Sequence, residues 1–576
     1  MNFTWEKRNS NVNSLEELMT QRKGIDYEIP NYLDLPTSEL PFIENLDEAA
    51  HLIVDYMQNN KRWYVVSDYD CDGVCSAVIM RSIVSFKEGY KYSSPVENIP
   101  DRFTEGYGVS QRRIASMPNK SLLVLLDNGI SKEQEIAYAK LKDMKVIVVD
   151  HHLAPPVLPN ADVIINPKID NASEFKEYCT GGLAMRLALR CAELLGYSEE
   201  EIAQVRRTWT FYAALATVAD MVPLTYENRL IVQNGLANIP EDCINIPRLL
   251  LGKPLETRSI TAEDVGYYIG PCINSCGRIR GNGGIDALQR LFCGTFVDPD
   301  RMEASMKHLL KINEQRKSIT KKVRKAADVI IEQNKLYESP IMIVRLRNAN
   351  QGVLGIVASG IMEKYKKPVI VLTDVHRFNL TGSGRAPEGF NLKDALDAVS
   401  GTLTKYGGHA AAAGLTLRAE DYDDFISKLT DHAKGITFDT NNYYDLPLDS
   451  MGDWEDIITK MEQYEPFGMG NETPVFKITM KLLPGKAGHK VMGTDKSHLR
   501  LCGFKYDATA FSLADKYKEL GSPETVTLYG IPRKNTINEQ TKIEFMAVDI
   551  QAADSPEVDD EIQLTDLGAA MFNSLS

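Results

Sequence analysis

Three aspartates occupy alternate positions in the stretch WYVVSDYDCDGVCSA, residues 63–77. Asp68, Asp70 and Asp72 are close enough to repel one another, which indicates a cation among them. The pattern also matches the start of a calcium-binding loop, D-x-D-x-D-G. That loop needs a glutamate at its twelfth position, where this chain has Ile79, and a helix before its first aspartate, where this chain has the strand-like run WYVV. The stretch therefore favours carboxylates that the end of a β-strand delivers to a metal.

Metal-type side chains also follow two further strand-like runs. SLLVLL is followed by Asp127, and KVIVV is followed by Asp150, His151 and His152. The carboxyl ends of parallel strands meet at one edge of a sheet, so we expect these side chains to converge. Asp220, near the end of the apolar stretch FYAALATVADMVPL, completes the set. Carboxylates mixed with imidazole suit Mn²⁺, Mg²⁺ or Fe²⁺ better than structural zinc, and a two-metal site of this kind clamps a phosphoryl group and activates water.

The elements that position these residues follow a regular order. Residues 45–225 alternate strand-like and helix-like stretches, which is typical of a mainly parallel, doubly wound sheet. From 298 to about 334 the chain is rich in Lys, Arg, Glu and Ala, which predicts one long helix. The chain is thus predicted to be a multidomain α/β protein with an N-terminal arm (1–44), a catalytic domain (45–297), a linking helix (298–338), a smaller α/β domain (339–436), a β-rich domain (437–552) and an acidic tail (553–576).

Composition limits the class of protein. The chain has 576 residues, a net charge of −14 and nine cysteines, an odd number without the spacing of a disulfide framework. It has no apolar run near the roughly 18 residues of a membrane span and no apolar signal segment at its start. We therefore expect a cytoplasmic protein that does not enter a membrane. Six acids lie in residues 554–576, and the rest of the chain can still offer a local basic groove to a polyanion.

An ordered set of motifs runs through the chain. DYDCDG, LLDNGIS, VVDHHL and VADMVPL resemble, in that order, the motifs of the DHH phosphoesterase superfamily. Further motifs resemble those of the RecJ-like branch of this superfamily, whose members are single-strand-specific exonucleases. These motifs are PDRFTEGYG, INSCGRI, GSGRAPEGFNLKDAL, YGGHAAAAGL and EPFGMGNETPVF. The resemblance covers residues 45–550 and implies a DHH domain at 45–297, a DHHA1 domain at 339–436 and an OB-like nucleic-acid-binding domain at 437–552.

The resemblance also implies roles for individual residues. The implied ligands of two divalent cations, Mn²⁺ or else Mg²⁺, are Asp70, Asp72, Asp127, His151 and Asp220, with Asp127 bridging and Asp68 as an additional ligand or supporting acid. His152 would face the scissile phosphate, and Asp150 would orient a histidine. The implied phosphate-binding residues are Arg102, Arg278, Ser383, Arg385, Gly407, Gly408 and His409.

The predicted function is exonucleolytic hydrolysis of single-stranded DNA to mononucleotides, with a 5′→3′ direction that only the resemblance implies. It would serve DNA repair, recombination or phage DNA metabolism. We expect a monomer whose protein partner is a single-strand-binding or repair protein. One alternative is a phosphodiesterase for short oligonucleotides or cyclic dinucleotides, whose architecture usually ends after the DHHA1 domain. The other is a catalytically inactive replication scaffold, against which the complete set of ligand residues counts.

Two positions bear on these alternatives. Small-molecule members of the superfamily carry a ligand histidine four positions before the aspartate that matches Asp70, and this chain has Val66 there, which favours the RecJ-like branch. Between two expected ligands the chain has Cys71, where relatives usually have a small or apolar residue. Cys71 is either an inert packing residue or a thiol that oxidants and thiol reagents reach.

Overall fold

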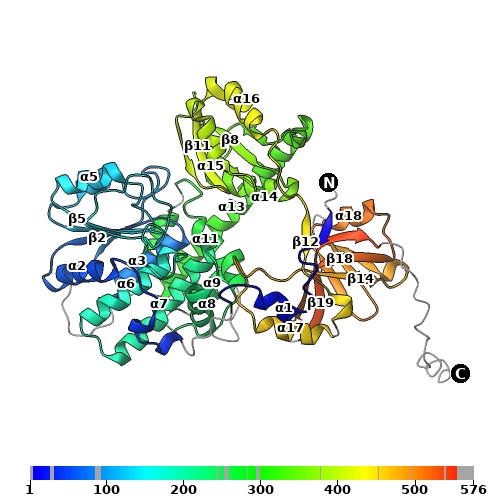
Figure 1. Cartoon of the computed structure of the whole chain (residues 1–576), viewed down its shortest axis with the longest axis horizontal. Helices are drawn as coiled ribbons and strands as arrows, with labels where there is room; N and C mark the ends of the chain where they lie inside the picture. Colours follow the sequence, from blue (N-terminus) through cyan, green and yellow to red (C-terminus); the bar gives the residue numbers. More distant parts are fainter. Residues whose placement is uncertain are drawn as a thin grey trace. The chain divides into compact units, whose positions relative to one another are not determined.

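The structure is a computed structural model of the whole chain (Figure 1). It describes residues 4–25, 32–84, 93–241, 243, 245–251, 259–281, 283–292, 299–375, 378–451, 453–493, 496–537 and 540–553. The chain divides into two compact units. The first consists mainly of Arg22–Thr440 with Pro466–Glu472, and the second of the N-terminal stretch up to Gln21, Asn441–Glu465 and the residues from Thr473 on. The predicted acidic tail, from 554, and the predicted boundary at 297/298 lie outside the described residues.

The first unit opens with the predicted parallel sheet. Its strands, paired in the order β3-β2-β4-β5-β6, are β2 (Trp63–Ser67), β3 (Val96–Asn98), β4 (Leu122–Leu126), β5 (Lys145–Val149) and β6 (Val163–Ile165). Every side chain of β4 is buried, as expected for a strand covered on both faces. Three strands were predicted; the two edge strands, β3 and β6, have three residues each, too few to show a pattern.

Helices cover both faces of this sheet. Alternate side chains of β4 enter two separate cores: Leu122, Val124 and Leu126 pack in one, and Leu123 and Leu125 pack in the other. The first core also takes side chains from α2 (Leu46–Gln58), α3 (Cys71–Ser82), α6 (Thr180–Leu194) and α7 (Glu199–Ala219). The second takes them from α4 (Gln111–Ser116) and α5 (Glu133–Leu141). This arrangement is the doubly wound fold that the sequence predicts.

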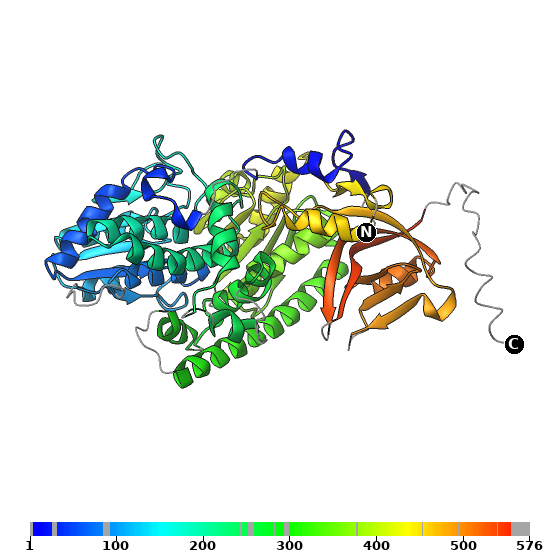
Figure 2. The same cartoon turned by 90° about the horizontal axis from the view of Figure 1, so that it is seen from below.

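Helices complete the catalytic region. They are α8 (Tyr226–Ala237), α9 (Asn245–Leu251), α10 (Ala262–Asp264), a π-helix (Val265–Ile269), α11 (Gly270–Asn274) and α12 (Gly284–Phe292). The predicted linking helix is α13 (Pro299–Gln333), which Figure 2 shows in green as one continuous helix. Its last turns pack through Ala327 and Ile331 against the smaller α/β domain.

That smaller domain is built on a second, mixed sheet. Its strands, in the order β10-β11-β9-β8-β7, are β7 (Met342–Leu346), β8 (Val369–Val375), β9 (Asn379–Arg385), β10 (Lys405–Gly408) and β11 (Ala412–Arg418). Strands β7 and β8 pair in parallel, and the other described pairs of this sheet are antiparallel. One face packs on α13 and α14 (Leu354–Tyr365), and the other on α15 (Leu392–Ala398) and α16 (Tyr422–Ala433).

The second unit is rich in β-structure, as predicted. Its seven-stranded sheet has the order β13-β14-β18-β19-β17-β16-β15. The strands are β13 (Leu446–Pro447), β14 (Phe476–Lys481), β15 (His489–Met492), β16 (His498–Cys502), β17 (Asp507–Ala510), β18 (Thr525–Ile537) and β19 (Gln540–Ala552). Helices α17 (Trp454–Glu462) and α18 (Ala514–Glu519) accompany it.

Residues 1–44, expected to form one separate arm, divide between the two units. Strand β1 (Trp5–Lys7) pairs with β12 (Asn442–Tyr444), and α1 (Leu15–Thr20) follows it in the second unit. Residues from Arg22 on belong to the first unit. The segment Pro466–Glu472 also belongs to the first unit, where the Leu224 amide donates to the Met469 carbonyl at 2.7 Å.

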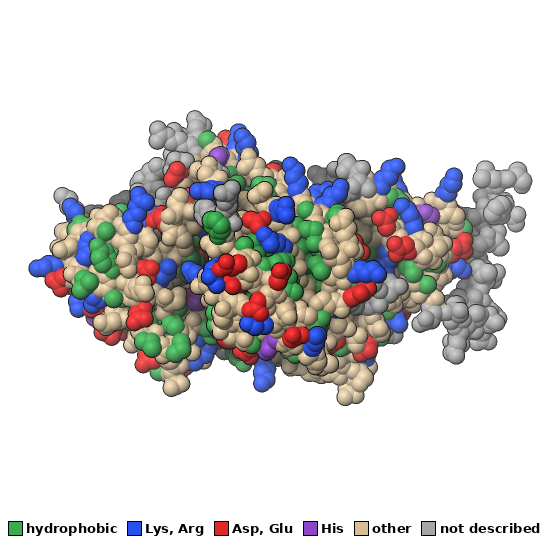
Figure 3. All heavy atoms as spheres, turned by 90° about the horizontal axis from the view of Figure 1, so that it is seen from above, with side chains coloured by type: hydrophobic (Ala, Val, Ile, Leu, Met, Phe, Trp, Pro, Cys, Tyr) green, Lys and Arg blue, Asp and Glu red, His purple; other side chains and the backbone are tan. Residues whose placement is uncertain are grey.

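The surface in Figure 3 carries charges of both signs. On this face, basic and acidic side chains are interspersed. Within the described ranges, no helix is both long and apolar enough to cross a membrane.

Candidate metal centre

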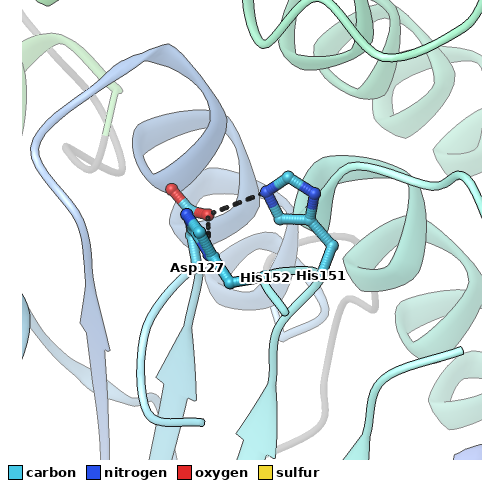
Figure 4. Close-up of side chains that lie close together, drawn as sticks. All are labelled: Asp127, His151 and His152. Carbon is cyan, nitrogen blue, oxygen red and sulfur yellow. Dashed lines mark ion pairs between the residues drawn. The ribbon is translucent and has the colours of Figure 1, made fainter. Parts of the chain in front are cut away.

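Four segments bring the predicted ligands to one edge of the parallel sheet. Asp68 follows β2, and Asp70 caps the N-terminus of α3, where its side chain accepts from the Gly73 amide at 3.1 Å. Asp127 follows β4 in the left-handed backbone region, with φ 60°. Asp220 caps the C-terminus of α7. The segment after β5 supplies the histidines, and Figure 4 shows both rings beside the Asp127 carboxylate.

The buried His151 ring lies at the centre of the cluster. Its Nε2 is 3.7 Å from Asp72 Oδ2, 3.5 Å from Asp127 Oδ1 and 3.4 Å from Asp220 Oδ2. Ligand atoms lie within 4.8 Å of one another in three groups, which are Asp68 with Asp70 and Asp127, Asp72 with His151 and Asp220, and Asp127 with both histidines. Asp127 thus lies close to ligand atoms of both other groups, and its bridging role stays a prediction.

Several buried polar atoms in the cluster have no hydrogen-bond partner in the protein. Among the described residues, these atoms include both ring nitrogens of His151 and the Oδ1 atom of Asp68. Buried polar groups are almost always hydrogen-bonded, and those without a partner indicate a role that the protein alone does not fulfil. Carboxylate oxygens together with a neutral imidazole are a suitable donor set for Mn²⁺ or Mg²⁺. The residues present therefore fit a pair of divalent cations, and Asp68 fits as a ligand.

The pKa shifts of the clustered carboxyl groups indicate that the protein alone does not neutralise their negative charge. Burial and the neighbouring Asp70 raise the pKa of Asp72 to about 6. Burial and adjacent carboxylates raise the pKa values of Asp68, Asp127 and Asp220 well above their ordinary range. Burial and the charge of His152 lower the pKa of His151 to about 3, so its ring is neutral and able to bind a cation.

Asp150 holds His152 in place. One oxygen of Asp150 accepts from the His151 and His152 amides and lies 2.7 Å from His152 Nδ1, and the other accepts from the Ile130 amide. Burial alone would raise the pKa of Asp150, but these hydrogen bonds and the His152 charge hold it below its ordinary value. Burial would lower the pKa of His152, yet the Asp150 bond and charge keep it above its ordinary value. Asp150 therefore orients and charges His152.

Two residues that sequence reasoning missed complete the cluster. The Thr180 amide donates to Asp72 Oδ2 at 2.9 Å, and its hydroxyl lies 3.4 Å from Asp127 Oδ1. The Tyr107 hydroxyl donates to the Asp127 carbonyl at 2.7 Å, and its ring lies edge-on to His152. The motif PDRFTEGYG contains Tyr107, whereas Thr180 carries no signal beyond its position at the start of α6.

Three of the predicted phosphate-binding residues lie together. Arg278 Nη1 donates to the Gly352 carbonyl at 3.3 Å, which brings it to the start of α14. Arg385 and Ser383 lie within 3.0 Å of each other and beside the first turn of the same helix, next to Gly355. A helix N-terminus with two guanidinium groups and a hydroxyl is well suited to bind an anion. Burial and the charge of Arg102 lower the pKa of Arg278 to about 10, so the group stays cationic at neutral pH.

The remaining candidates lie in different settings. The Arg102 guanidinium lies over the Tyr69 ring at 5.6 Å. His409 lines a cavity with His151 and His152, so it faces the metal cluster. Gly407 has open space around it, whereas a β-carbon on Gly408 would lie 2.3 Å from the Ala412 carbonyl oxygen. Gly408 is therefore required by the β10–β11 hairpin itself. The ligand and binding roles of all these residues stay predictions.

Known proteins share this architecture. Models of the DHH family N-terminal domain, the DHHA1 domain and the RecJ OB domain match residues 62–217, 338–435 and 444–549. The single-stranded-DNA-specific exonuclease RecJ of Dickeya dadantii is 30% identical over 73% of this chain and 72% of its own length. The chain belongs to the RecJ family. Its predicted family, fold class and type of enzyme are thereby confirmed.

Other RecJ proteins support this assignment. The RecJ of Bacillus subtilis is 29% identical over 92% of this chain, which spans 66% of that relative's length. The crystal structure of RecJ in complex with Mn²⁺ from Thermus thermophilus has a TM-score of 0.75, with 24% identity over 91% of this chain and 74% of that one. The same protein has also been crystallised with Mg²⁺, and that structure has a TM-score of 0.68. This likeness shows that the fold of the RecJ family extends over most of the chain.

Cys71 is enclosed by the protein. The side chain is buried, and its Sγ lies 4.0 Å from Cys75 Sγ and 3.8 Å from the Leu215 carbonyl. The neighbouring Cys75 thiol and burial raise the pKa of Cys71 well above its ordinary value. A buried, protonated thiol reacts poorly, so the structure favours the packing role over the reactive one.

Proposed function

We propose that this protein degrades single-stranded DNA from its 5′ end to mononucleotides, with two divalent cations. The observation that carries the proposal is the convergence of five carboxylates and a neutral histidine at one sheet edge, where some of their buried atoms have no hydrogen-bond partner among the described residues. The residues predicted to bind phosphate at the start of α14, which are Arg278, Ser383 and Arg385, belong to the same unit. The direction is the one that the family resemblance implies.

The cations would be held by two half-sites. Asp68, Asp70 and Asp127 form one, and Asp72, His151 and Asp220 form the other, with Asp127 close enough to His151 to serve both. When bound, such cations neutralise phosphoryl oxygens and make water acidic enough to act as a nucleophile at neutral pH. We propose Mn²⁺ in preference to Mg²⁺, because the donor set includes an imidazole. RecJ from Thermus thermophilus has been crystallised with either ion, so Mg²⁺ is the second candidate.

His152, held by Asp150, would act on the scissile phosphate. Because Nδ1 is held by Asp150, Nε2 is the ring nitrogen left to face a substrate. The raised pKa of His152 favours the protonated ring, which can donate a hydrogen bond to a phosphate oxygen as negative charge develops there. Asp150 is a positioning residue that fixes the ring and its charge.

Arg278, Ser383 and Arg385 would bind the terminal phosphate and so fix the position of the strand end. Guanidinium groups bind a terminal phosphate dianion more strongly than an internal phosphodiester monoanion. A terminal phosphate held at α14 would fix how far the chain extends to the metal centre, and so release one nucleotide per cleavage. That spacing distinguishes an exonuclease from an endonuclease.

The second unit would hold the rest of the strand. It contains the match to the RecJ OB domain and exposes two large aromatic side chains, Phe504 (69% exposed) and Phe511 (51%). Exposed aromatics in OB folds stack on bases without regard to sequence. We propose a cytoplasmic monomer whose protein partner is a single-strand-binding or repair protein, with a role in DNA repair, recombination or phage DNA metabolism. The OB domain counts against the alternative of a phosphodiesterase for short substrates.

A gel assay tests the proposal. Oligonucleotides labelled at the 5′ or the 3′ end, single-stranded or in duplex, are incubated with the protein and Mn²⁺. We expect a 5′ label to appear at once as mononucleotide, a 3′ label to shorten in steps, and blunt duplexes to persist. Early release of the 3′ label as mononucleotide would reverse the direction, and equal digestion of duplexes would contradict single-strand specificity. Absence of any hydrolysis with either cation would contradict the enzymatic function.

A further inference from the structure

A cavity of about 830 Å³ opens on one side of the metal centre. Its lining includes His151 and Asp220, from one half-site, and His409. Arg102, Arg278, Ser383 and Arg385 do not line it. The cavity is large enough for a nucleotide with its hydration water, since pockets for ligands of that size span about 300–1,000 Å³.

Charges distinguish the two sides of the metal centre. Arg102 lies over the Tyr69 ring, and Gly277, next to Arg278, packs against the same ring, so both arginines lie beside the segment that carries Asp68 and Asp70. Lys168 instead lines the cavity together with His151, Asp220 and His409. One half-site therefore has guanidinium groups beside it, and the other has an ammonium group. A strand whose end was held by the arginines and whose scissile phosphate lay at the metal centre would extend toward the side of Lys168.

Lys168 is available for a ligand. Its side chain is 23% exposed, and its Nζ lies 3.9 Å from the Glu177 carboxylate, a long and weak contact. Lys176, which also lines the cavity, is engaged: its Nζ donates to the Asp170 carbonyl at 2.7 Å and lies 3.2 Å from the Asp170 carboxylate. Lys176 thus fixes the conformation of the cavity wall at Asp170 and neutralises the charge of that carboxylate. Of the two lysines among the described residues that line the cavity, Lys168 is the one left to meet an anion.

Two apolar side chains in the same cavity are largely exposed. Leu153 is 61% exposed and Met221 is 72% exposed. Met221 also has φ 59°, the left-handed conformation that is common for the residue after a helix C-cap, and its amide donates to the Val218 carbonyl at the end of α7. Leu153 lies two residues after the predicted ligand His151, and Met221 directly follows the predicted ligand Asp220. Their exposed side chains therefore lie beside the metal centre.

We propose that this cavity is a subsite for the second nucleotide of the strand, whose base packs on Leu153 and Met221 and whose 3′ phosphate pairs with Lys168. The proposal rests on the proposed exonuclease function. The apolar surface in this cavity complements a base, and the lysine complements a phosphate. Such contacts do not depend on the identity of the base or on the sugar. The subsite holds the strand just beyond the bond that is cut, and so keeps the new end in place for the next cycle.

The test uses three 5′-phosphorylated thymidine hexamers and the full-length protein. One hexamer is unmodified, one lacks the base at its second nucleotide, and one carries a neutral methylphosphonate between its second and third nucleotides. Binding is measured by fluorescence anisotropy with Ca²⁺, and hydrolysis with Mn²⁺. The variants are Leu153→Ala and Lys168→Gln, and the matched control is Lys61→Gln, which removes an exposed lysine that pairs with Asp55 at 2.7 Å.

We expect the wild type and Lys61→Gln to bind each modified hexamer about tenfold more weakly than the unmodified one. Leu153→Ala should no longer discriminate against the missing base, and Lys168→Gln should no longer discriminate against the neutral linkage. Equal binding of all three hexamers by the wild type would overturn the subsite. So would a loss of affinity in Lys168→Gln that is the same for charged and neutral linkages. If unmodified hexamer is still cut from its 5′ end in these cases, only the subsite fails; if it is not cut at all, the proposed function fails as well.

Discussion

Removal of the cations should make the stability of the catalytic domain fall as the pH rises. Asp72 is 1% exposed, and its pKa is raised from 3.8 to about 6 by burial and by Asp70. A folded-state pKa above the unfolded value means that the native state binds more protons than the unfolded state. The stabilisation is then fully present below pH 3.8 and is lost as the pH rises through about 6. Asp68, Asp127 and Asp220 shift in the same direction and add to the loss.

The shift of Asp72 gives the size of the effect. Roughly two pKa units correspond to about 3 kcal/mol of unfolding free energy, lost between about pH 4 and pH 7. Bound Mn²⁺ should reverse the loss, because the carboxylates then hold a cation instead of repelling one another. The assay is urea unfolding at several pH values, with EDTA or with Mn²⁺, followed through the fluorescence of Trp63 and Trp209, which are buried in this domain.

Two variants separate the metal cluster from other buried acids. Asp72→Asn should flatten the pH dependence in EDTA, whatever its effect on absolute stability. Glu97, whose pKa burial raises to about 7 and which pairs with Arg81, lies outside the cluster. Glu97→Gln should also reduce the slope, but equally with and without Mn²⁺. If metal-free stability rises between pH 5 and pH 7, or if Asp72→Asn has the wild-type slope, the explanation by uncompensated carboxylates is wrong.

Three further predictions concern single sites. Asp127→Ala and His151→Ala should each lower hydrolysis on the order of 10³-fold with excess Mn²⁺ while the metal-free protein melts cooperatively; near-normal rates would refute the ligand assignment. Cys71→Val should stay active, and thiol reagents should not inactivate the native wild type through this residue; protection by Cys71→Val against inactivation would contradict its packing role. Arg278→Lys should raise KM about tenfold for 5′-phosphorylated strands and much less for 5′-hydroxyl strands; an equal effect on both would remove Arg278 from the terminal-phosphate site.

The convergence of the candidate residues was predictable for those that directly follow strands, because the sequence marks these strands clearly. The apolar runs before Asp68, Asp127 and Asp150 place all three at one edge of a parallel sheet, and no knowledge of packing is needed. Thr180 was not predictable in this way. Its contacts with Asp72 and Asp127 depend on how α6 packs against the sheet, which no local pattern reports.

Domain membership was less predictable than the site, because it depends on pairing between distant segments. Strand β1 has three residues, and Trp5 is positioned by contacts with distant residues: its ring stacks on Tyr529 at 4.1 Å, and its Nε1 donates to Asp549 at 2.7 Å. The segment Pro466–Glu472 is bounded by residues of the second unit but belongs to the first. Its Gly468 lies against Leu224, and its Asn471 accepts a hydrogen bond from Arg22. Sequence patterns report local structure well and such exchanges hardly at all.

That exchange changes how the OB domain must be tested. Truncation near residue 436 would remove most of the second unit but not its N-terminal stretch, and would also remove Pro466–Glu472, whose contact with Leu224 is four residues from Asp220. The truncated protein would therefore lose support for the metal centre as well as a DNA-binding surface. Point variants avoid this, since Phe504 and Phe511 are exposed and contribute little to folding.

The double variant Phe504→Ala with Phe511→Ala should weaken the binding of long single strands. Base stacking on an aromatic side chain contributes about 1–3 kcal/mol, so the loss of even one stack lowers affinity about fivefold or more. The salt dependence of binding should not change, because no phosphate contact is removed. Hydrolysis of dinucleotides should be unaffected, and Phe378→Ala, which removes an exposed aromatic (74% exposed) from the smaller α/β domain, is the matched control. If the double variant binds long strands as tightly as the Phe378→Ala control does, these aromatics do not hold the DNA.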